Sequence, residues 1–125
     1  MIENEISKIV IGAAIEVHKQ LGPGLLESAY AECLSYELQI NKLRFDREKP
    51  VPVFYKGKKL DCGYKLDFCI KDKVIVELKA IETILPIHEA QILTYLKLTG
   101  IKLGLLINFN VPILRDGIKR IVLNL

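Results

Sequence analysis

The segment VIVELKA (residues 74–80) decides the fold, because it reads as a buried strand interrupted by two charged residues. Three β-branched residues open it, and Glu77 and Lys79 follow two positions apart. Side chains alternate between the two faces of a strand, so these two side chains point to the same side. An isolated charge inside a core is costly unless it is paired or bound to something. The segment therefore predicts a strand with a chemical role.

The preceding segment YKLDFCI (64–70) predicts a second strand, with its apolar residues on one face and Asp67 on the other. If residues 71–73 form the loop, the two strands make a hairpin in which Asp67 lies directly opposite Glu77. Two-residue loops are commoner, but an odd-numbered loop gives both strands a common apolar face. Two opposed carboxylates repel each other, and a cation between them reverses that effect. The alternative is a surface pair of Glu77 and Lys79 on an edge strand, with Asp67 solvated nearby.

The rest of the chain predicts three helices and further strands. Helical spacing of apolar residues covers 3–20 and about 25–41, with LGPG (21–24) between them, and Pro86 to Thr99 form a third helix closed by Gly100. Strand patterns cover VPVFY (51–55), KLGLLINF (102–109) and IKRIVLN (118–124), with KGKK (56–59) and KDK (71–73) as turns. The order ααβββαββ predicts an α/β fold, a mixed β-sheet flanked by α-helices.

Length and composition predict a single domain over residues 1–125. Half of the residues are hydrophobic and the mean hydropathy is +0.26, which is apolar for so short a chain and predicts a homodimer. The net charge of +3 permits a polyanionic partner without requiring one. An odd number of cysteines, without CxxC or a secretory signal, predicts a cytoplasmic protein, and no apolar stretch is long enough to span a membrane.

Further motifs accompany the two strands. GLLESAY (24–30) reads G-x-x-E-x-x-Y, and HEAQILTYLKLTG (88–100) and GLLINFN (104–110) follow it in order. Together with D…ExK on adjacent strands, this pattern resembles the PD-(D/E)XK nuclease superfamily and, within it, the GxxExxY family. Where the superfamily has Pro-Asp, this chain has Leu66–Asp67. The resemblance covers nearly the whole chain and implies a restriction-endonuclease-like fold.

The resemblance also implies a metal-dependent nuclease with a site formed by Glu27, Asp67, Glu77, Lys79 and Gln91. The three carboxylates would offer hard oxygen ligands to Mg²⁺ or Mn²⁺. Such a metal polarises a phosphoryl oxygen and lowers the pKa of a bound water. Lys79 would orient or deprotonate that water, and Gln91 would hold the water or Lys79 in place. The implied substrate is nucleic acid, either DNA or RNA.

Several of these residues have a structural alternative. Glu27 is also an ordinary first-turn acid that satisfies the helix dipole, and this is the favoured reading from the residues alone. Four residues are candidates for positions beside the site: His18, Tyr30, His88 and Tyr95. His18 also suits a cation near a helix C-terminus, and the helical stripe of His88, Gln91 and Tyr95 also suits an ordinary polar flank. The turn KGKK is usually a solvated hairpin tip, with a phosphate contact as the alternative.

Two further expectations concern function. The alternative to a nuclease is a catalytically silent module on the same fold that binds nucleic acid or another protein. Without a metal, the crowding of Glu27, Asp67 and Glu77 predicts a raised pKa for at least one of these carboxylates.

Overall fold

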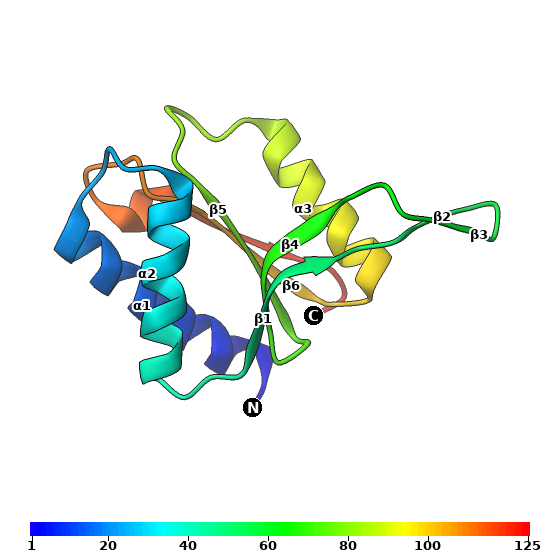
Figure 1. Cartoon of the computed structure of the whole chain (residues 1–125), viewed down its shortest axis with the longest axis horizontal. Coiled ribbons are helices and arrows are strands. Elements are labelled where there is room, and N and C mark those ends of the chain that lie inside the picture. The colour runs from blue at the N-terminus through cyan, green and yellow to red at the C-terminus, as the bar shows by residue number, and fades with distance from the viewer.

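The computed structural model describes residues 1–125 and forms a five-stranded mixed sheet with helices on both faces (Figure 1). The helices are α1 (Glu3–Leu21), α2 (Glu27–Ile40) and α3 (Pro86–Thr99), and a short 3-10 helix, η1, spans Leu114–Gly117. The sheet contains β1 (Phe45–Pro50), β4 (Lys65–Ile70), β5 (Val74–Lys79), β6 (Leu103–Asn108) and β7 (Ile118–Val122) in the order β1-β4-β5-β6-β7. A separate two-stranded ribbon consists of β2 (Val53–Tyr55) and β3 (Lys58–Leu60). The predicted α/β fold class is confirmed.

The hairpin of β4 and β5 has the predicted odd-numbered loop. Ile70 pairs with Val74, so the loop is residues 71–73, and the antiparallel register continues to Phe68 and Val76. β5 then pairs in parallel with β6. A parallel pair needs a long crossover, and α3 provides it. These pairings place β5 in the middle of the sheet.

Two apolar cores cover the faces of the sheet. The larger one lies between the sheet and helices α1 and α2, and it includes Val74, Val76 and Leu78 of β5. The smaller one lies between the sheet and α3, and it includes Ile75 of the same strand. Because β5 is covered on both sides, a charged residue in its interior, such as Glu77, is buried.

The sequence did not predict β1 or β3. β1 reads FDREKP, and its residues alternate between half-buried and exposed, as suits a charged edge strand that pairs only with β4. The predicted strand 51–55 begins later, at Val53, because Pro52 lacks an N–H for pairing. The turn at KGKK is narrower than predicted, since Lys58 already belongs to β3.

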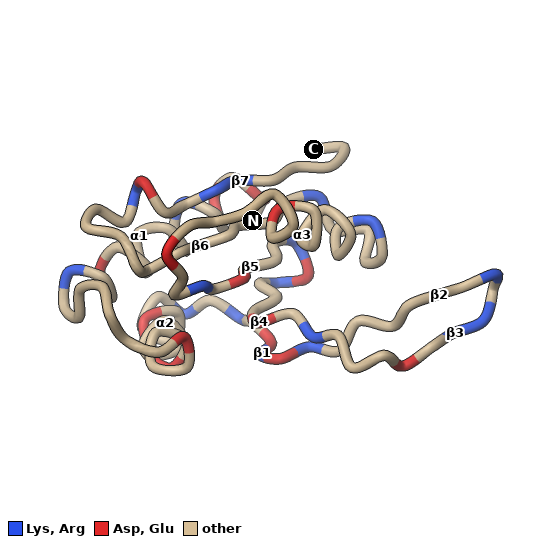
Figure 2. The backbone as a smooth tube through the Cα atoms, turned by 90° about the horizontal axis from the view of Figure 1, so that it is seen from above, with Lys and Arg blue, Asp and Glu red and all other residues tan.

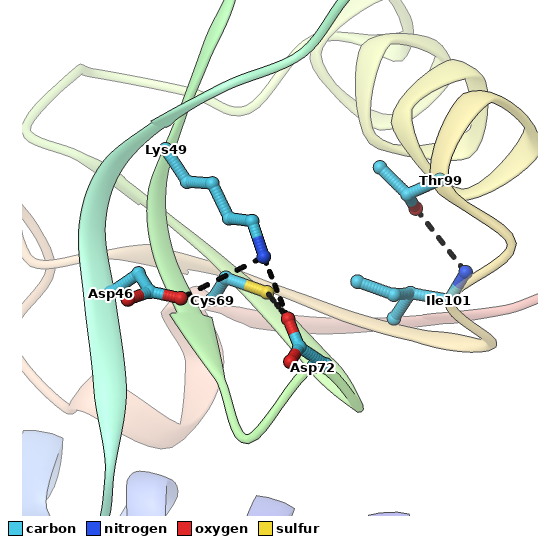
Figure 3. A network of polar contacts seen from close by, with 6 residues as sticks. All are labelled: Asp46, Lys49, Cys69, Asp72, Thr99 and Ile101. Atoms are coloured by element: carbon cyan, nitrogen blue, oxygen red, sulfur yellow. Dashed lines mark hydrogen bonds and ion pairs between the residues drawn. The ribbon is translucent and has the colours of Figure 1, made fainter.

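The ends of α3 follow the sequence signals. Pro86 occupies its first turn, and Gly100 ends it with φ of 77° and an N–H that donates to the Leu96 carbonyl at 2.9 Å. Beyond it, the Ile101 N–H donates to the Thr99 hydroxyl at 3.2 Å (Figure 3). None of the helices combines the length and the apolar character that a membrane span requires.

Candidate active site

The candidate site begins where β4 and β5 stop pairing. In a continued ladder Asp67 would pair with Glu77, but the register ends one pair earlier, at Phe68 and Val76. The backbone N–H of Leu78 instead donates to the Asp67 carboxylate at 2.9 Å. A side chain thus replaces a backbone partner and holds its carboxylate between the two strands. We call this region, Asp67 and residues 77–79, the open end of the hairpin.

The face of Asp67 differs from the prediction. Phe68 belongs to the core under α1 and α2, whereas Leu66 belongs to the core under α3, so strict alternation fails between them. The facing residue in β1 is Glu48, which has a left-handed φ of 51°. Such a φ is uncommon outside glycine and interrupts the regular pleat. The expectation that the apolar residues of β4 share one face, opposite Asp67, was therefore wrong.

This distortion brings Asp67 toward α2. A shallow cavity of about 160 Å³ is lined by Glu27, Ser28, Ala31, Arg47, Glu48, Asp67 and Leu78. Glu27 is exposed at the first position of α2 and lines this cavity together with Asp67. Arg47 is the cation of the cavity lining, and it also donates to Glu32 at 3.0 Å. Neither Arg47 nor Glu48 was expected at the site, because β1 was not recognised as a strand beside β4.

Glu77 is the most perturbed acid of the molecule. Its side chain is only 8% exposed, and its Oε1 atom is buried without a hydrogen-bond partner. Burial, followed by the negative charge of Asp67, raises the pKa of Glu77 to about 9. The charge of Lys79 opposes this rise of the pKa, but less strongly than burial and Asp67 promote it. The expectation of a raised pKa is confirmed, with burial as the largest cause and Asp67 as the neighbouring charge.

Lys79 is half-buried at the end of β5, and its backbone is fixed from β6. It lies in register with Asn108, and its carbonyl accepts from the Phe109 N–H at 2.9 Å. Asn108 is 2% exposed and binds the backbone of the loop that follows β5. Its amide oxygen accepts from the Ile81 N–H at 3.1 Å, and its Nδ2 donates to the Ile81 carbonyl at 2.9 Å. A polar residue inside the apolar run GLLINF was the sequence signal for this positioning role, which the sequence reasoning missed.

Gln91 and Tyr95 approach from the other side of the sheet. The Nε2 of Gln91 donates to the Tyr95 hydroxyl at 3.2 Å. Tyr95 is buried, and burial followed by the charge of Glu77 raises the pKa of its phenol. Both residues line a cavity of about 480 Å³ with Tyr64 and His88. Gln91 therefore lies on the α3 side of the sheet beside Tyr95, whereas Glu27 lines the cavity of Asp67 and Leu78 on the α2 side.

Tyr30 has a structural position. Its hydroxyl donates to the Gly22 carbonyl at 2.6 Å and accepts from the Leu25 N–H at 3.2 Å. Its ring stacks on Phe109, with the centroids 4.3 Å apart. The Tyr of the G-x-x-E-x-x-Y motif thus fastens the LGPG loop and the start of α2, the helix that carries Glu27.

The two histidines also make structural contacts. The Nε2 of His18 donates to the Val111 carbonyl at 2.8 Å, which ties the end of α1 to the segment after β6. The Nδ1 of His88 accepts from the Leu85 N–H at 2.9 Å and so caps the start of α3. Neither contact is directed at the carboxylates of the open end.

The donor set at the open end suits a hard divalent cation. Asp67 and Glu77 are neighbouring carboxylates, and the buried Oε1 of Glu77 has no hydrogen-bond donor, so it is free to bind a cation. Mg²⁺ in proteins is commonly held by one or two carboxylates, with waters and substrate phosphates completing its shell. No three His, Cys, Asp or Glu side chains are grouped closely enough to hold a metal by themselves.

Comparison with known proteins gives the family. The family model described as the PD-(D/E)XK nuclease superfamily matches residues 4–121, nearly the whole chain. No curated protein and no solved structure matches the chain. The five-stranded mixed sheet between helices agrees with the restriction-endonuclease-like fold of that superfamily, whose nucleases generally depend on a divalent metal and act on nucleic acid. The chain therefore belongs to the PD-(D/E)XK nuclease superfamily.

Proposed function

We propose that this chain is a metal-dependent nuclease that hydrolyses phosphodiester bonds, a single-domain member of the GxxExxY family. The observation that carries the proposal is the buried, unpartnered oxygen of Glu77 beside Asp67. Buried polar atoms are nearly always partnered, and an exception in a central strand calls for a ligand. A divalent cation satisfies this oxygen and also removes the repulsion between the two carboxylates.

Each proposed residue has a role that its position supports. Asp67 and Glu77 hold Mg²⁺ or Mn²⁺, which when bound supplies a Lewis acid that lowers the pKa of a coordinated water. Glu27 lines the shallow cavity together with Asp67 and would accept hydrogen bonds from water or substrate bound there. Lys79 brings a positive charge to the scissile phosphate and orients the attacking water. Gln91, braced by Tyr95, donates a hydrogen bond from the α3 side.

A catalytically silent module that binds nucleic acid is the second candidate. It is favoured by one observation, the lack of three side chains grouped for a metal. In that case the carboxylates of the open end would be remnants of a nuclease site.

A cleavage assay separates the two candidates. Labelled DNA and RNA substrates are incubated with Mg²⁺, Mn²⁺ or EDTA, and metal binding is followed by calorimetry. A nuclease cleaves only with metal, and Asp67→Ala and Glu77→Ala lose both cleavage and metal binding. A wild-type protein that binds no metal and cleaves no substrate leaves the silent module as the function.

The assembly and location are part of the proposal. Large apolar side chains remain exposed on the surface, among them Leu26, Tyr36 and Ile87, which supports a homodimer. A dimer would carry two sites, as cutting both strands of a duplex requires. All three cysteines are free, which supports a reducing, cytoplasmic location. Light scattering that returns a monomer mass at high concentration would refute the dimer.

A further inference from the structure

The β2–β3 ribbon projects from the body of the protein and has no partner in the main sheet (Figure 1). We define residues 53–60 as the arm. Its tip is a two-residue turn of Lys56 and Gly57, both with positive φ, as type I′ hairpin turns require. Isolated two-stranded hairpins are marginally stable in water. An arm that stands free of the core therefore calls for a role outside it.

The arm holds the excess positive charge of the chain. The sequence has 18 Lys and Arg against 15 Asp and Glu, and three of those lysines are Lys56, Lys58 and Lys59. The remainder of the chain has equal numbers of each sign, and no acidic residue lies within the arm. Figure 2 shows these basic positions at the tip and along β3. The net charge is thus a local property of the arm.

Aromatic residues accompany the lysines on both faces of the arm. Phe54 is 57% exposed and pairs with Lys59 across the ribbon. Tyr55 is 62% exposed and pairs with Lys58. Directly opposed residues point to the same face and successive residues to opposite faces. Each face therefore presents one exposed aromatic ring beside one lysine, and the Lys56 ammonium also lies over the Tyr55 ring, 5.5 Å from its centroid.

We infer that the arm binds nucleic acid, with its lysines on phosphates and its aromatic rings stacked on unpaired bases. Rings beside cations are the usual means of holding single strands, because every base offers a flat face and every linkage a negative charge. From Val53 to the tip at Lys56 the arm reaches roughly 10 Å at ~3.3 Å per residue.

The cavity at the base of the arm connects this surface with the proposed site. Val53 of the arm and Tyr64 line it together with Gln91 and Tyr95 of α3. The ring of Tyr64 contacts that of Tyr95 edge-on, with 6.2 Å between the centroids. The charge of Glu77 contributes to the raised pKa of the Tyr95 phenol. A strand held by the arm would thus run over α3 toward the open end. The choice of nucleic acid as ligand rests on the proposed nuclease function.

Binding without catalysis tests the inference. Anisotropy of a labelled single-stranded oligonucleotide and of its duplex is measured in EDTA over a range of NaCl concentrations. Two variants change the arm and keep its turn: Lys58→Gln/Lys59→Gln and Phe54→Ser/Tyr55→Ser. The control, Lys8→Gln/Lys19→Gln, removes the same charge from exposed positions of α1. Thermal unfolding verifies that all four proteins fold alike.

The expected effects differ between the variants. The lysine variant binds the single strand more weakly, and its slope of log K against log salt falls by roughly 1.4, about 0.7 for each phosphate contact. The aromatic variant loses roughly fivefold or more in affinity with the slope unchanged. The control binds like wild type, and wild type prefers the single strand to the duplex.

Other outcomes overturn the inference. It fails if either arm variant binds like the control, if wild type binds neither oligonucleotide, or if the aromatic variant changes the oligomeric mass in light scattering, which would make the arm a contact between copies. A wild type that cleaves nothing while the arm variants lose binding refutes the proposed nuclease alone. Cleavage by wild type with unchanged binding by the arm variants refutes the arm alone.

Discussion

At the loop end of the β4–β5 hairpin three residue pairs lie in register, whereas at the open end a carboxylate takes the place of a backbone partner. Asp72 in the loop is exposed and pairs with Lys49 at 2.6 Å (Figure 3), while Glu77 is buried with an unpartnered oxygen. One end satisfies its polar groups within the protein and the other leaves one unsatisfied. Charged residues are present at both ends of the hairpin, so charge by itself does not mark a ligand site. The unpartnered buried oxygen at the open end is what indicates that a ligand is needed there.

The largest expected effect is the loss of cleavage when Lys79, the lysine at the open end, is replaced. Lys79→Ala should lower cleavage by roughly 10² to 10⁴, because general acid–base or electrostatic roles at a phosphate are worth that much. Stabilisation by Mg²⁺ should persist, because both carboxylates remain. Single-turnover cleavage and thermal unfolding with and without metal measure the two quantities.

The matched control is Lys73→Ala at the loop end, where the lysine ammonium donates to the Met1 carbonyl at 2.8 Å. This variant should cleave like wild type. If Lys79→Ala also cleaves like wild type, Lys79 is structural and the two ends do not differ in catalysis.

The second effect is a loss of folding stability when Phe68, the buried aromatic residue of β4 next to the open end, is truncated. Phe68 is fully buried, lies 5.7 Å from Phe45 between ring centroids, and belongs to the last pair before the strands separate. Phe68→Ala should lower the free energy of unfolding by roughly 3–5 kcal/mol, through lost burial and the cavity left behind. Urea unfolding measures it.

An exposed aromatic provides the control for packing. Tyr55→Ala in the arm should change the free energy of unfolding by no more than about 0.5 kcal/mol. Equal losses for both variants would mean that the arm is packed in solution.

The third effect is a pH dependence that comes from the open end. With a folded pKa of about 9 and an ordinary value of 4.5, Glu77 keeps its proton in the folded state over a range where the unfolded chain loses it. The unfolded state then binds fewer protons, so stability falls as the pH rises through this window, by about 1.4 kcal/mol per pH unit. Glu77→Gln should remove this dependence and be the more stable protein at pH 8 in EDTA.

Denaturant unfolding from pH 5 to 9, without metal, tests this prediction. Saturating Mg²⁺ should reverse the order of the two proteins, because only the carboxylate gains from the cation. Parallel pH profiles for wild type and Glu77→Gln would mean that Glu77 is ionised in the folded protein.

The sequence predicted the hairpin better than it predicted the open end. The apolar alternation of β5 and the three residues 71–73 sufficed for the register, because one face of each strand had to be buried. The face of Asp67 was mispredicted, because it depends on the left-handed Glu48 in β1, a charged edge strand without an apolar pattern. The sequence indicated a buried strand around Glu77 but left a surface pair with Lys79 as the alternative, because the cover of both faces of β5 comes from distant helices.

The smallest expected effect lies at the loop end and has the opposite pH sign. The hydrogen bond from Lys49 lowers the pKa of Asp72, so its contribution to stability is present above the ordinary value of 3.8 and is lost as the pH falls. Both side chains are well exposed to solvent, which limits the pair to about 1 kcal/mol or less and makes it sensitive to salt. A double-mutant cycle of Asp72→Asn and Lys49→Met, followed by thermal unfolding at pH 7, measures the coupling.

The neighbouring pair supplies a control for this coupling. Asp46 lies farther from Lys49, at 3.7 Å, so Asp46→Asn should couple to Lys49→Met more weakly than Asp72→Asn does. High salt should abolish both couplings while leaving the alkaline destabilisation from buried Glu77 nearly unchanged, because salt screens exposed charges far more than buried ones. If salt removed the alkaline effect as well, the open end would be as solvated as the loop end, and the physical case for a ligand at Glu77 would be lost.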